Sequence, residues 1–76
     1  MKLFMIIVLA GKIGGNAGPL PYDMEECESR ALELRLQCTD KPENPYRCAE
    51  IEFKCEWREH RPINDPTAGD RMRSLK

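Results

Sequence analysis

The first block of apolar residues lies at the N-terminus, where an unbroken run follows a single lysine. Lys2 precedes the run Leu3–Ala10, and small residues follow at Gly15–Ala17. A positive residue, an apolar run and small residues before a cleavage point are typical of a secretory leader. The run is too short to cross a bilayer as a helix. We therefore expect residues 1–17 to be a signal peptide and the mature chain to begin at Gly18; an apolar strand or a buried helix start is the alternative.

The second block of apolar residues repeats at helical spacing. Asp23 followed by Glu26 forms a capping-box pattern at its start, and Glu26 with Arg30 forms an i,i+4 pair of opposite charge. Ala31–Leu36 alternates as a strand would, but its composition favours helix. We predict a helix from about Met24 to Cys38. The positions that share one face of that helix are Met24, Cys27, Ala31, Leu34 and Cys38.

The next helical signal follows a turn-rich connection at residues 39–44. Asn44 followed by Pro45 is a helix start signal, and Arg61-Pro62 is a stop. We predict a second helix from about Pro45 to His60. The expected fold class is therefore all-α, an antiparallel two-helix hairpin over residues 18–62. Residues 63–76 show no apolar periodicity, so we expect a flexible, disordered tail there.

Four cysteines lie beyond the expected leader, and each predicted helix carries two of them on one face. A 76-residue chain buries little apolar surface and usually needs a covalent or metal staple. In an antiparallel hairpin, Cys38 would bond to Cys48 near the turn and Cys27 to Cys55 at the open end. The first pair of cysteines is eleven residues apart and the second is seven. The helices would therefore be out of register by about 6 Å, one helical turn.

Zinc is the competing role for these cysteines. Structural zinc sites usually draw their ligands from close pairs such as C-x-x-C, and this chain has none. We therefore expect two disulfides, an oxidising compartment, no metal site and no cofactor.

Charge and composition exclude several classes of function. The chain has 12 Lys+Arg and 13 Asp+Glu, so removing a leader that contains Lys2 and Lys12 would leave a net charge of −3. Such a body lacks the basic patch of a nucleic-acid binder and the basic face of a membrane-surface helix. The single histidine, His60, supports no nucleophilic triad, and no phosphate-binding glycine loop is present. We therefore expect no enzymatic activity, no catalytic residue, no small-molecule substrate and no nucleic-acid partner.

Apolar residues that the expected hairpin seam does not use would face outward. They lie opposite the cysteine face of each predicted helix. Aromatic residues often anchor binding surfaces, so we expect this stripe to bind a protein partner; packing within the chain or a homodimer is the alternative. The residues are Phe53, Trp57, Tyr46, Leu32 and Leu36.

The layout resembles that of small exported proteins encoded by temperate phages. Lys2 with a short apolar leader, a small cysteine-bearing body and a polar tail make the chain similar to Cor-type superinfection-exclusion proteins. That resemblance implies a periplasmic or outer-membrane-associated protein that blocks an outer-membrane phage receptor. Secreted helical-hairpin toxins and inhibitors share the expected architecture, and so do mitochondrial twin-cysteine hairpins, whose cysteine spacing differs. Two classes of function stay open: a binding or inhibitory module, and a self-associating structural protein of the envelope.

Overall fold

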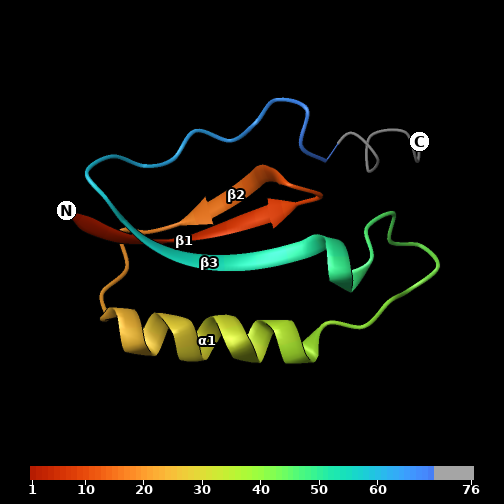
Figure 1. Ribbon diagram of the computed structural model, residues 1–76, viewed down its shortest axis with the longest axis horizontal. Helices are drawn as coiled ribbons and strands as arrows, with labels where there is room; N and C mark the ends of the chain where they lie inside the picture. The colour runs from red at the N-terminus through yellow and green to blue at the C-terminus, as the bar shows by residue number, and fades with distance from the viewer. Residues whose placement is uncertain (70–76) are drawn as a thin grey trace.

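The computed structural model describes residues 1–69. Its elements run in the order β1 (Lys2–Leu9), β2 (Lys12–Ala17), α1 (Met24–Gln37), the short 3-10 helix η1 (Cys48–Glu50) and β3 (Ile51–Arg58). The three strands form one antiparallel sheet in the order β2-β1-β3. Figure 1 shows α1 running alongside β3, with β1 and β2 beyond it.

The expected all-α two-helix hairpin is wrong, because the segment predicted as the second helix forms η1 and β3. Asn44 Oδ1 accepts a hydrogen bond of 2.9 Å from the N–H of Tyr46, which makes a local turn instead of starting a long helix. From Ile51 onward, apolar and charged residues alternate strictly. A strand places all the apolar members of that pattern on one face, whereas a helix would scatter them.

The N-terminal apolar run forms β1, the central strand of the sheet. Four consecutive residues, Leu3 to Ile6, are at most 7% exposed, because both faces of the strand are covered. A strand buried on both faces has the continuous apolar run that also characterises a leader. A mature chain that began at Gly18 would lack both β1 and β2.

A tight turn with left-handed backbone joins β1 to β2. Ala10 and Gly11 have φ values of 49° and 84°, as the favoured two-residue hairpin turns require at both positions. Just after β2, Gly18 has a φ of 148°, and a Cβ there would lie 2.5 Å from Cδ1 of Phe4. Glycine is therefore required where the chain leaves the sheet.

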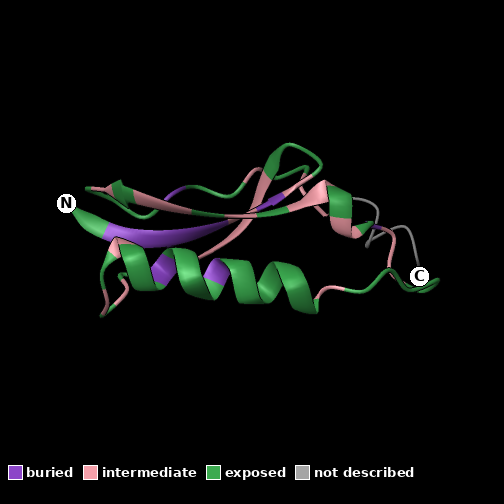
Figure 2. Ribbon diagram, turned by 60° about the horizontal axis from the view of Figure 1, so that its bottom comes forward, coloured by how far each residue is buried: buried purple, intermediate pink, exposed green. Residues whose placement is uncertain are grey.

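Helix α1 begins as the sequence predicts and covers one face of the sheet. Asp23 Oδ1 accepts a 2.9 Å hydrogen bond from the N–H of Glu26, and Glu26 forms an ion pair with Arg30 at 2.8 Å. Figure 2 shows burial only on the side of α1 that faces the sheet. The cluster at this contact consists of Leu3, Met5, Cys27 and Ala31.

The other face of β1 is covered by the C-terminal strap, which we define as residues 59–69. The Arg61 guanidinium lies over the Phe4 ring at 5.5 Å, and Pro62 is buried. The N–H of Asp65 donates a 2.7 Å hydrogen bond to the carbonyl of Ile13, so the strap follows β2 (Figure 1). Residues 63–69 of the expected tail therefore pack on the sheet, while residues 70–76 lie outside the described part of the chain.

Candidate functional site

The two faces of β3 have opposite character. Its alternate residues Ile51, Phe53, Cys55 and Trp57 share the face of the sheet that α1 covers. In the register with β1, Phe53 lies opposite Ile7 and Trp57 lies opposite Leu3. The other face carries only charged side chains, which pair along the strand as Lys54–Glu52 at 3.7 Å and Arg58–Glu56 at 2.9 Å.

Two disulfides attach α1 and the loop that follows it to η1 and β3. Cys27 bonds to Cys55 with a Cα–Cα distance of 6.1 Å, and Cys38 bonds to Cys48 with one of 6.0 Å. These are the pairs expected from the sequence. The pairing did not require a second helix. Because η1 and β3 run back antiparallel to α1, Cys48 comes near Cys38 and Cys55 comes near Cys27, as they would in a helical hairpin. The mismatch expected between two helices does not apply, because Cys38 lies just beyond the end of α1 and Cys48 lies in η1, so their bond does not join two regular helices in a fixed register.

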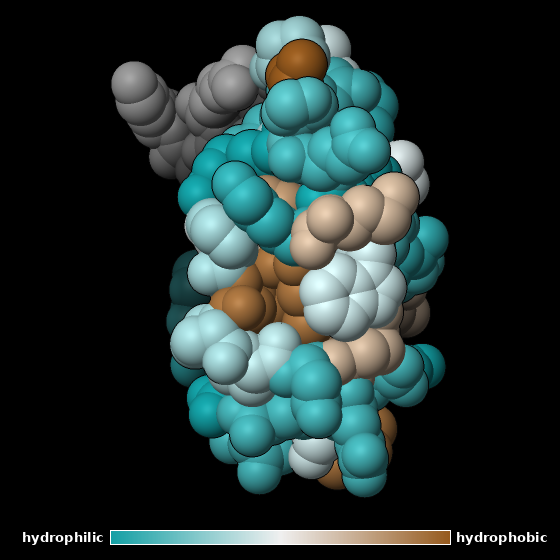
Figure 3. All heavy atoms as spheres, turned by 90° about the vertical axis from the view of Figure 1, so that its left-hand side faces the viewer, coloured by the Kyte–Doolittle hydropathy of each residue, from teal (hydrophilic) through white to brown (hydrophobic). Residues whose placement is uncertain are grey.

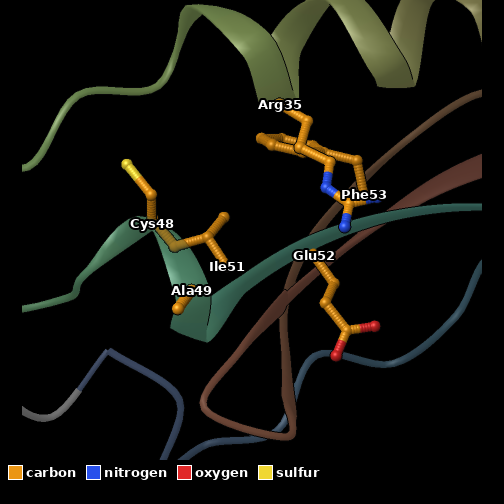
Figure 4. Close-up of a pocket in the computed structure, with 6 residues that line it drawn as sticks. All are labelled: Arg35, Cys48, Ala49, Ile51, Glu52 and Phe53. Carbon is orange, nitrogen blue, oxygen red and sulfur yellow. The ribbon is translucent and has the colours of Figure 1, made fainter.

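A hollow between α1 and β3 is the candidate binding site, and we call it the α1–β3 groove. Its volume is about 260 Å³. Figure 4 shows Arg35 reaching from α1 toward β3 beside Phe53, while Glu52 points to the far side of the strand. Leu36 borders the same region with Ile51 and Phe53, and Leu32 lines an adjoining hollow with Phe53 and Cys55. The lining residues of the groove proper are Arg35, Cys48, Ala49, Ile51, Glu52 and Phe53.

Large apolar side chains are exposed around this groove. Leu36 is 75% exposed and Leu32 is 53% exposed, whereas the buried residues of α1 are Cys27 and Ala31. At the other end of β3, Trp57 is 47% exposed. Figure 3 views that end of the molecule and shows a hydrophobic hollow rimmed by hydrophilic residues. Exposed apolar surface of this kind marks interaction sites more often than it marks stable free surface.

The structure brings together three of the five residues expected to bind a partner, Leu32, Leu36 and Phe53, whereas Trp57 lies at the other end of β3. Phe53 and Trp57 lie on the same side as Cys55, not opposite it, because β3 has a period of two. Tyr46 is only 5% exposed and stands apart, and its hydroxyl accepts a 3.0 Å hydrogen bond from the N–H of Gly69. It packs within the fold.

Sequence reasoning missed four of the six residues that line the groove, which are Arg35, Ala49, Ile51 and Glu52. The signal that could have found Ile51 was the alternation of apolar and charged residues from Ile51 to Arg58, which is that of a half-buried strand.

The groove offers alkyl, aromatic and guanidinium surface for contact. In residues 1–69, no three His, Cys, Asp or Glu side chains gather as a metal site, and the four cysteines are all in disulfides. A carboxyl with a shifted pKa lies elsewhere, in the strap: hydrogen bonds from the hydroxyl and then the N–H of Thr67 lower the pKa of Asp65, with a smaller contribution from Lys12.

Comparison with protein-family models, with curated proteins and with solved structures found no match for this chain. Among the described residues, no helix has the length and apolar character needed to span a bilayer. The two disulfides are consistent with an exported protein.

Proposed function

We propose that this protein is a non-enzymatic binding module of an oxidising compartment, and that it binds another protein through the α1–β3 groove. The observation that carries the proposal is the exposure of Leu32 and Leu36 beside a groove to which Ile51 and Phe53 contribute apolar surface. Two disulfides hold both walls in place before binding, which lowers the entropy lost on association.

The finer form of the proposal is that the partner is an outer-membrane receptor that the protein blocks from the periplasm or the membrane surface. It rests on the disulfides and on the resemblance noted from the sequence, of which the small cysteine-bearing body remains, while the apolar run forms β1. Affinity capture from a bacterial outer-membrane preparation tests it, and the absence of any enriched outer-membrane protein would count against it.

Replacement of Leu32 and Leu36 by Glu tests the binding surface itself. Both side chains are exposed, so the disulfides and the circular dichroism should stay as in the wild type. We expect the double variant to lose its captured partner. Ile63→Glu is the matched control, because Ile63 is 89% exposed and lies in the strap, away from the groove. Retention of the partner by the double variant would refute the proposal.

Self-association is the second candidate, and the exposed leucines of α1 favour it. Leu32 and Leu36 lie one turn apart, so two antiparallel copies of α1 could cover each other's leucines. Sedimentation of the purified chain separates the two candidates: a monomer at micromolar concentration favours a different partner, and a dimer abolished by the double Glu variant favours self-association.

A further inference from the structure

The outer edge of β3 has unused backbone groups. The sheet order leaves β3 at an edge, and Ala10 donates a 2.8 Å hydrogen bond to the carbonyl of Glu50, its register partner just beyond β3. Antiparallel pairing alternates by two residues, so the N–H and C=O of Phe53, Cys55 and Trp57 point away from β1. Within residues 1–69, no hydrogen bond is made to these outward groups.

The α1–β3 groove opens along this same edge. Arg35 comes from α1, on one face of the sheet, and the side chain of Glu52 points to the other face (Figure 4). Both residues line the same hollow, so the hollow lies at the edge of β3, where the two faces meet. A strand added at this edge would therefore place one set of side chains beside Leu32 and Leu36. Its other side chains would lie on the charged face of β3. The edge thus combines backbone groups for pairing with a hollow that side chains can enter, and both are features of strand addition.

The charged face of β3 sets the pattern that such a strand must match. Its charges run negative, positive, negative, positive along the strand. Directly opposite residues of an antiparallel pair interact, and opposite charges favour the pairing. Two antiparallel strands that both have the β3 sequence fulfil this condition. When they pair with Cys55 opposite Cys55, Glu52 lies opposite Arg58 and Lys54 lies opposite Glu56. Phe53 then lies opposite Trp57.

A second copy of the whole chain does not fit that register. The Cys27–Cys55 bond holds the α1 backbone 6.1 Å from Cys55, measured between Cα atoms. Two copies paired at Cys55 would bring their Cys55 Cα atoms to about 5.5 Å, with both copies of α1 on the same face of the joined sheet. Packed helices need about 8–10 Å between axes. The occupant is therefore a strand without a helix of its own above it.

We propose that the free edge of β3 binds an extended segment of another protein as a fourth, antiparallel strand. The inference rests on the proposed function and names the chemistry of its partner. The segment has apolar side chains that face α1, alternating with side chains of alternating charge. The charged positions lie opposite Glu52, Lys54, Glu56 and Arg58.

A peptide with the β3 sequence, with serine in place of Cys55, is a suitable probe because it carries the complementary pattern and no helix. In the expected register, its residues at the Phe53 and Trp57 positions turn their N–H groups toward the protein, and those at the Lys54 and Glu56 positions turn theirs to solvent. N-methylation at the solvent-facing positions should preserve binding. N-methylation at the protein-facing positions should weaken it at least about tenfold, because two hydrogen bonds are lost. Titration of the labelled full chain by NMR measures both affinities and locates the contact.

A charge exchange tests the register. Lys54→Glu in the protein should weaken the probe by up to about fivefold, and a probe with lysine at its Glu56 position should recover that loss. Equal binding of the two N-methylated peptides, or no binding of either, would overturn the inference. A partner captured through Leu32 and Leu36 but not displaced by the probe would overturn it while leaving the proposed function intact. A dimer of the full chain that Lys54→Glu dissociates would show that a second copy is the occupant instead.

Discussion

Phe4→Ala tests whether the N-terminal residues are part of the folded protein. Phe4 is 2% exposed on the central strand, and the Arg61 guanidinium lies over its ring. Truncation of a buried phenylalanine to alanine costs about 3–5 kcal/mol. Domains of this kind have about 5–15 kcal/mol of unfolding free energy, so the loss is a large share of it. With a guanidinium slope of about 2 kcal/mol/M, the unfolding midpoint should fall by at least about 1.5 M.

The assay is equilibrium unfolding of the oxidised full chain, followed by the fluorescence of Trp57, which lies opposite Leu3 in the sheet. The chain is refolded after purification so that any effect on export is removed. Lys2→Ala is the matched control, because Lys2 lies on the same strand and is exposed; its midpoint should stay within the scatter of surface substitutions. A Phe4→Ala midpoint equal to that of the control would refute the role of β1 as the central strand.

Three further predictions concern the staples and the strap. Removal of the Cys27–Cys55 bond should lower the free energy of unfolding by about 3.6 kcal/mol, and removal of the Cys38–Cys48 bond by about 2.7 kcal/mol, because the loops they close span 28 and 10 residues. Chemical unfolding of paired Cys→Ala variants measures both losses. A larger loss from removal of the Cys38–Cys48 bond would contradict this prediction. Arg61→Ala should lower the free energy of unfolding by about 1 kcal/mol and speed hydrogen exchange at the N–H of Asp65, because the Arg61 guanidinium donates hydrogen bonds to Asn16 and Gly18. Glu43→Ala is the control: Glu43 lies on an exposed loop, so neither the stability nor the exchange rate should change. Asp65→Asn should lower the thermal midpoint at neutral pH but not in acid: the lowered pKa of Asp65 means that its stabilisation is present above the ordinary carboxyl range and is lost as the pH falls through the lowered value. A gap between wild type and Asp65→Asn that is the same at both pH values would contradict this.

Local signals predicted α1, because its start depends on nearby residues. The cap at Asp23 and the ion pair from Glu26 to Arg30 are properties of a short segment, and both are present in the structure. The cysteine pairs were also predictable, because their order along the chain allows one nested pairing in any structure that doubles back. Neither inference required the correct fold.

The strands could not be predicted in the same way. The apolar run of β1 fits a leader as well as a central strand, and only its pairing with β2 and β3 separates the two. For β3, two local patterns conflict. Asn44-Pro45 indicates the start of a helix, whereas the alternation of apolar and charged residues from Ile51 to Arg58 indicates a strand. In the structure Asn44 makes only a local turn. Leu32 and Leu36 were expected to face outward and do so, but the groove beside them depends on β3 and on Arg35.

The intact mass of the natively expressed, unreduced protein is the decisive measurement, because β1 and β2 of the sheet lie within residues 2–17. We expect a chain that retains the residues of β1 and β2 and lacks four thiol hydrogens, as two disulfides require. Loss of Met1 alone would be compatible, since it is 81% exposed. A chain that begins at Gly18 could not form this sheet, and a chain with free thiols would lack its disulfides; either result would refute the fold described above.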